Sequence, residues 1–98
     1  MLVALERFDL KIPGCTSLKQ KRHVVKSLTN ALRSTFDVSV AEVDHQELWQ
    51  RATIAVAAVG AHEYHVRRVA REIERFVEAW GAVEVLAADL TLHDPDDR

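Results

Sequence analysis

Hydrophobic and polar residues alternate over residues 2–12, as in a strand with one buried face and one wet face. The apolar side carries Leu2, Ala4, Phe8, Leu10 and Ile12. The wet side carries Arg7, Asp9 and Lys11. Glu6 interrupts the apolar side, and the pattern offers no account of it. Pro13 and Gly14 end the predicted strand, because this dipeptide is typical of turns.

The next segment is predicted to be a helix that begins after Ser17. Gln20 follows Ser17 by three residues, which fits a capping box in which each side chain bonds the backbone amide of the other residue. Apolar residues then recur at helical spacing until the helix ends near Phe36: Leu18, Val25, Leu28 and Leu32.

The second half of the chain predicts a strand pair, a second helix and a last strand. Residues 38–43 and 51–59 are rich in β-branched and small apolar residues, as strands are. The second helix is indicated by an apolar stripe of Val66, Val69, Ile73, Val77 and Trp80, with Phe76 beside it. Gly81 is expected to cap that helix, and residues 83–92 to form the last strand.

The predicted order β-α-β-β-α-β is that of an α+β, ferredoxin-like fold. We expect one domain over residues 1–93, with a four-stranded antiparallel sheet in the order 4-1-3-2, both helices on one face, and a polar tail over residues 94–98. Right-handed crossovers leave little choice of topology. The loop after the first strand, the hairpin between the second and third strands and the loop after the second helix then share one end.

Composition narrows the function classes. A chain of 98 residues with a net charge of −2 fits one globular domain with no overall attraction to polyanions, so nucleic acid would need a local basic patch. Cys15 is the only cysteine, which excludes an intramolecular disulfide and suits a reducing compartment. No apolar run approaches the roughly 20 residues of a membrane span, and the apolar N-terminus is too short for a signal peptide. We therefore expect a cytoplasmic protein without a membrane partner.

Several segments resemble the YlxP-like family of small bacterial proteins. They are residues 12–15 (Ile-Pro-Gly-Cys), 17–22, 40–46 and 48–52. The resemblance covers nearly the whole chain and implies a ferredoxin-like fold. It implies no activity, because the function of the family is unknown. Its members are often encoded beside translation-initiation and ribosome-maturation factors, which is an association and no mechanism. Glu6 departs from the apolar residue that the family pattern leads one to expect.

Helix one carries a basic stripe formed by Lys19, Arg22, Lys26 and Arg33, with Asn30 between them and His23 at its edge. Such a stripe can follow a row of phosphates, although a solvated helix face would show the same pattern. Three cations also crowd the first turn, where the helix dipole disfavours positive charge: Lys19, Lys21 and Arg22. They need either acidic neighbours or an anionic ligand.

Lys21 and the hairpin over residues 44–51 have two interpretations each. Lys21 projects toward the apolar side of the helix, which suggests an ion pair with Glu42, Asp44 or Glu47, or else a ligand contact. The hairpin is dense in polar residues and contains no Gly or Pro that would identify it as a simple turn. Its Trp49 can either pack over the hairpin as a lid or make an exposed contact with a partner.

We expect no catalytic or metal centre. Cys15 near a helix start could be activated, but nothing in the sequence ties it to His45 as a base. Asp44 and His45 lack a third metal ligand, because His62 and His65 should lie at the opposite end. On helix two, acidic and basic residues alternate, with i,i+4 pairs such as Glu63–Arg67 and Arg68–Glu72.

The expected function is a non-enzymatic module, without a cofactor, that binds structured RNA or a ribosome-associated assembly. Its predicted contacts are Lys19, Lys21, Arg22, Lys26, Trp49 and Arg51. The alternative is a protein that forms homo-oligomers through its open sheet face or an edge strand, because Ala41, Ala55, Ala57 and Val59 make that face apolar. A third possibility is an enzyme acting on a small anion. Strand three offers no aromatic residue for stacking bases, unlike an RNA-recognition motif.

Overall fold

A computed structural model describes residues 1–96 and confirms the ferredoxin-like order of elements. The elements are β1 (Leu2–Lys11), α1 (Leu18–Thr35), β2 (Ser39–Asp44), β3 (Arg51–Gly60), α2 (Glu63–Glu78) and β4 (Glu84–His93). Of the predicted tail, residues 97 and 98 lie outside the described part. Neither helix within residues 1–96 is long and apolar enough to cross a membrane.

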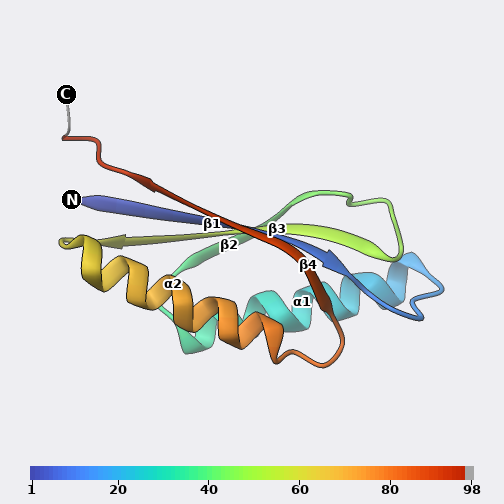
Figure 1. Cartoon of the computed structure of the whole chain (residues 1–98). Coiled ribbons are helices and arrows are strands. Elements are labelled where there is room, and N and C mark those ends of the chain that lie inside the picture. The colour runs from blue at the N-terminus through green and yellow to red at the C-terminus, as the bar shows by residue number, and fades with distance from the viewer. Residues whose placement is uncertain (97–98) are drawn as a thin grey trace.

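The four strands form one antiparallel sheet in the order β2-β3-β1-β4, which is the predicted order read from the other edge. Both helices pack against the same face, and the other face carries no helix or strand of residues 1–96 (Figure 1). The central strands β1 and β3 pair over ten residues each, with Phe8 opposite Ile54 and Asp9 opposite Thr53. The first pair faces the helices, so the second lies on the open face.

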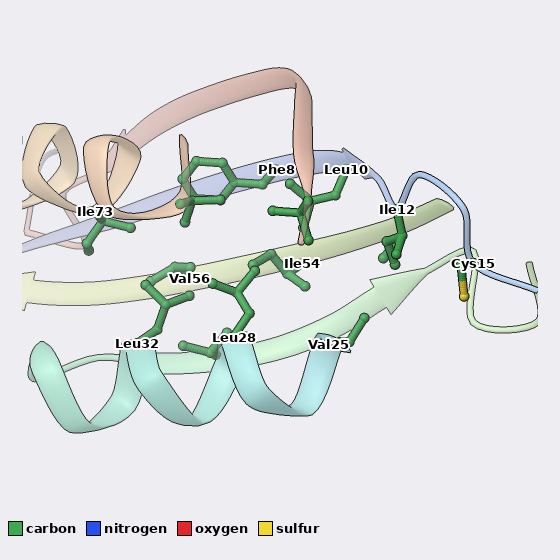
Figure 2. Close-up of a cluster of buried hydrophobic side chains, with 14 residues drawn as sticks. Phe8, Leu10, Ile12, Cys15, Val25, Leu28, Leu32, Ile54, Val56 and Ile73 are labelled. Atoms are coloured by element: carbon green, nitrogen blue, oxygen red, sulfur yellow. The ribbon is translucent and has the colours of Figure 1, made fainter. Parts of the chain in front are cut away.

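The core fills the space between the sheet and the helices. Figure 2 shows Phe8 and Ile54 from the sheet, Leu28 and Leu32 from α1, and Ile73 from α2 in one cluster. These five side chains are at most 2% exposed. Burying each contributes roughly 1.5–3 kcal/mol, so this layer is the main reason that α1 and α2 stay on the sheet.

The helix ends match the predictions in part. At the start of α1, the Gln20 amide donates to Ser17 Oγ (3.1 Å), as a capping box requires. The return bond differs, because Gln20 Oε1 accepts from the Thr16 amide (3.0 Å) instead of the Ser17 amide. The prediction that Gly81 caps α2 is wrong. The helix ends at Glu78 with Ala79 as its C-cap, and Gly81 lies in the following turn without a positive φ.

Candidate functional site

The loop after β1 and the β2–β3 hairpin share one end of the molecule, as the topology predicts (Figure 1). The Ile12 amide donates to the Gln50 carbonyl (2.9 Å), and Gln50 Nε2 donates to the Cys15 carbonyl (3.3 Å). The turn after α2 reaches α1 at the same end, where His23, Trp80 and Gly81 help to line a shallow depression. Three segments far apart in sequence therefore meet around the start of α1.

The basic stripe of α1 lies on the solvent side of the helix. Lys19, Arg22 and Lys26 are exposed, and none of them forms an ion pair with a residue of the described chain. Arg33 has a different role, because its guanidinium donates to the Val40 carbonyl (2.6 Å) and to Asn30 Oδ1 (3.2 Å). Arg33 thus attaches the helix to β2, and the available stripe consists of Lys19, Arg22 and Lys26.

Lys21 is a structural residue and does not reach the surface. Its side chain is 1% exposed, and its ammonium group lies 2.8 Å from Glu42 Oε2. The same ammonium group also donates a hydrogen bond to the His45 carbonyl. The placement of Lys21 among the RNA contacts is therefore wrong, and its alternative interpretation as an ion pair is correct. Of the three predicted acidic partners, the structure selects Glu42.

His45 is fixed by bonds on three sides. Its backbone has a positive φ of 59°, which is uncommon for a residue other than glycine, and its amide donates to Asp44 Oδ1 (2.8 Å). Its ring Nδ1 lies 2.9 Å from Thr53 Oγ1. The Thr53 hydroxyl donates to Asp9 Oδ1 (2.8 Å). Because the hydroxyl proton points to Asp9, Thr53 accepts from Nδ1–H, which leaves Nε2 as the free ring nitrogen.

This chain of bonds crosses the open face from β1 to the hairpin. Thr53 is fully buried there, although no helix covers that face. From the sequence, Asp9 and Thr53 could each be assigned only to the exposed face of a strand. Their pairing depends on the register of β1 and β3, in which they are directly opposite. These hydrogen bonds hold the hairpin on the open side, while the buried Lys21–Glu42 pair holds it from the helix side.

Cys15 and His45 do not form a nucleophile and base pair. Cys15 is buried in the core on the helix side of the sheet, and its thiol donates to the Ser17 carbonyl (3.3 Å). The His45 ring is instead bonded to Thr53 on the open face. In the part of the chain that the structure describes, no three His, Cys, Asp or Glu side chains gather as metal ligands do.

Trp49 and Arg51 belong to the β2–β3 hairpin and to the start of β3. Trp49 is 51% exposed, and residues 47–51 line a pocket of about 440 Å³. Arg51 begins β3 on the same side as Thr53, opposite Lys11 of β1, so it emerges on the open face. The sheet therefore separates Arg51 from the helices, whereas the sequence predicted it as a contact beside the basic residues of α1.

Glu6 faces the helices and is 2% exposed, with both carboxyl oxygens buried and without a hydrogen-bond partner among residues 1–96. Burial, which is the largest cause, and the neighbouring Glu74 and Asp89 together raise the pKa of Glu6 to about 8. Glu6 is thus protonated at neutral pH. The interruption of the apolar pattern was the sequence signal of this unusual group.

The fold and the surfaces place this protein in the class of small ferredoxin-like domains with one sheet face uncovered. The chain belongs to the family described as "Protein of unknown function (DUF503)", whose model matches residues 3–90. The uncharacterized protein YlxP of Bacillus subtilis (strain 168) is 29% identical over 68 residues, which cover 69% of this chain and 74% of that protein. The predicted resemblance to a YlxP-like family is confirmed.

Two solved structures are similar in fold. The crystal structure of At3g17210 from Arabidopsis thaliana has a TM-score of 0.51 and 12% identity, with 98% of this chain and 97% of that chain covered. The structure of a mutant of SnoaB, a cofactor-independent oxygenase from Streptomyces nogalater, has a TM-score of 0.47 and 10% identity, with 99% and 94% covered. At these identities the first likeness shows the fold alone, and the second carries no argument.

Proposed function

We propose that this protein is a non-enzymatic binding module whose α1 stripe contacts the phosphates of structured RNA, free or within a ribosome-associated assembly. The observation that carries this proposal is the charge of α1. The helix has five basic side chains and no acidic one in a chain whose net charge is −2. Lys21 and Arg33 are used internally, so Lys19, Arg22 and Lys26 remain for a ligand.

Helix α2 provides the contrast within the same molecule. It carries four acidic and four basic side chains, and Glu63 pairs with Arg67 at 3.6 Å. The predicted Arg68–Glu72 pair does not form, because Arg68 contacts His65 instead. A surface with balanced charges is a common solvated helix face. The unbalanced surface of α1 instead attracts a polyanion, and the amides at the start of the helix add to its positive potential.

The arrangement favours structured RNA over single strands. The stripe is straight, because Lys19 and Lys26 are seven residues apart on one helix, which corresponds to roughly 10 Å along the axis. A row of point charges reads the phosphate backbone and its shape, and it makes no contact with base edges. No aromatic residue lies within α1 to stack an unpaired base.

The salt dependence of RNA binding tests this proposal. The variant Lys19→Gln with Arg22→Gln should bind a structured RNA more weakly and flatten the dependence of affinity on salt by roughly two units of log–log slope. The matched control is Arg68→Gln with Arg71→Gln, which removes the same charge from the exposed face of α2 and should change both quantities much less. Equal losses in the two double variants would show only a general charge effect and would contradict the proposal.

The open sheet face favours a second candidate function, self-association. Val59 is 68% exposed and Leu5 is 45% exposed, and the small side chains of Ala55 and Ala57 lie beside them on the same face. A wet sheet face normally alternates with polar residues, so this surface suits contact with another apolar surface. The occupant that we propose is a second copy of this chain.

A further inference from the structure

Arg51 has hydrogen-bonding capacity that residues 1–96 do not use. Its Nε is buried without an acceptor, and no carboxylate of residues 1–96 lies within ion-pairing distance of its guanidinium. A buried donor without a partner is unfavourable, and native proteins rarely leave a charged one in this state. Since Nε is buried, an external anion would bond the terminal nitrogens of the Arg51 guanidinium, which has no counter-ion among the described residues.

Lys11 places a second cation beside Arg51. The two residues are directly opposite in the β1–β3 ladder, so both side chains emerge on the open face. Like charges at opposite positions destabilise a sheet. Glu84 is the partner of Lys11 on the β4 side, yet the described residues show no ion pair between them. An anion between Lys11 and Arg51 would relieve this repulsion.

The neighbouring pocket adds an aromatic surface. Residues 47–51 line this shallow, open depression of about 440 Å³. Trp49 stands half exposed in that wall. Hydrogen bonds anchor the loop on both sides of Trp49, because Gln50 bonds the loop after β1 through its carbonyl and its side chain, and the His45 ring bonds Thr53. An exposed indole next to a cation is suited to stack a planar ring that carries a negative group.

We propose that this pocket binds a phosphorylated nucleotide, with the base against Trp49 and the phosphate between Arg51 and Lys11. Glu47 in the same wall supplies an acceptor for a ribose hydroxyl or a base amino group. The nucleotide can be a free mononucleotide or the terminal residue of an RNA strand, since both present the same chemistry. Arg51 and Lys11 lie across the sheet from the α1 stripe, so this proposal does not depend on RNA binding there.

The indole N–H signals of the intact protein test the site by NMR, with Trp80 as an internal control. Adenosine 5′-monophosphate should shift the Trp49 signal and the amides of residues 47–51 saturably, and it should leave the Trp80 signal in place. Adenosine and inorganic phosphate should each bind at least roughly tenfold more weakly, because each lacks one half of the ligand. A 5′-phosphorylated RNA trinucleotide identifies the source: tighter binding than the mononucleotide indicates a strand end, and equal binding indicates a free nucleotide.

Variants separate this site from the α1 stripe. Arg51→Gln should weaken mononucleotide binding roughly tenfold or more, and Lys19→Gln with Arg22→Gln should leave it unchanged. If Arg51→Gln does not fold, Lys11→Gln at an exposed position carries the same expectation. The proposal is overturned by the absence of a saturable Trp49 shift up to ~10 mM mononucleotide. It is also overturned by unchanged binding in the folded Arg51 or Lys11 variant, or by inorganic phosphate that binds as tightly as the mononucleotide.

Discussion

Glu6 shows how one residue can set the response of the whole domain to pH. Its carboxyl group is enclosed between β1 and α2 with no donor to stabilise a negative charge, and Glu74 and Asp89 are its acidic neighbours. The folded protein therefore keeps the proton to about pH 8, whereas an exposed glutamate loses it near pH 4.5. Between these values the unfolded state binds fewer protons than the folded state, so the free energy of unfolding falls as pH rises.

We predict that Glu6→Leu removes this dependence. In the parent, the free energy of unfolding should fall by up to ~1.4 kcal/mol per pH unit over that interval. The variant should have a flatter profile and a higher stability near pH 8, because a neutral apolar side chain replaces the ionising one. Urea unfolding followed by circular dichroism across the interval measures both. Glu72→Gln, an exposed change on α2, should keep the slope of the parent; parallel profiles for the parent and Glu6→Leu would contradict the prediction.

Lys21 and Glu42 form a largely buried ion pair, and its stabilising effect depends on both partners. Lys21→Met should lower the free energy of unfolding by ~3 kcal/mol, because it leaves Glu42 without a counter-ion and the His45 carbonyl without a donor. Adding Glu42→Gln should restore part of this loss. Chemical denaturation of the parent, both single variants and the double variant measures the coupling. Additive losses would show that the ion pair does not stabilise the fold.

At the scale of elements, the cap of α1 is the most local determinant of the fold. Ser17 accepts from the Gln20 amide, so Ser17→Ala should lower the free energy of unfolding by ~1 kcal/mol. Ser34→Ala is the matched control at the other end of the helix, where the hydroxyl only donates to the Ala31 carbonyl (3.1 Å) on the surface, and it should be close to neutral. Thermal unfolding compares the two. Equal losses would assign no special role to the cap.

The elements themselves could be predicted because periodicity is a local property. The period-2 pattern of residues 2–12 and the helical spacing of Leu28 and Leu32 each required only neighbouring residues. The end of α2 could not be predicted in this way. Trp80 continues the apolar stripe beyond the helix because it packs on Phe76, with ring centroids 5.7 Å apart, and this contact does not require a helical backbone.

The candidate site depended on information of longer range. Side chains alternate between the two faces of a strand, and Arg51 and Thr53 are separated by one residue of β3. The sequence would therefore have placed Arg51 on the open face with Thr53. The choice of Glu42 among three acids, and the bond from Thr53 to Asp9, required the register between strands. The positive φ of His45 had no sequence signal, because the bonds that fix it come from Asp44, Lys21 and Thr53 together.

At the scale of the whole molecule, the two faces of the sheet differ in kind. One is covered by α1 and α2, and the other is left open (Figure 1). The open face has an apolar half around Leu5 and Val59. Arg7 of β1 and Asp89 of β4 are opposite each other on the open face. A two-fold axis can place Arg7 of one copy against Asp89 of the other, because an isologous interface brings the same surface together twice.

We predict that the protein is a dimer through this face. Light scattering at ~100 µM, where even a dimer of modest affinity is populated, should give the mass of two chains. Leu5→Gln with Val59→Gln should give a folded monomer, because the contact loses the apolar area that drives it. Tyr64→Gln is the control, since Tyr64 is 73% exposed but lies on α2, and it should leave the mass of the dimer unchanged. Because α1 is on the opposite side of the sheet, the monomeric variant should keep the salt-dependent affinity for RNA. A parent that remains monomeric at this concentration would remove self-association and leave the α1 stripe as the one proposed function.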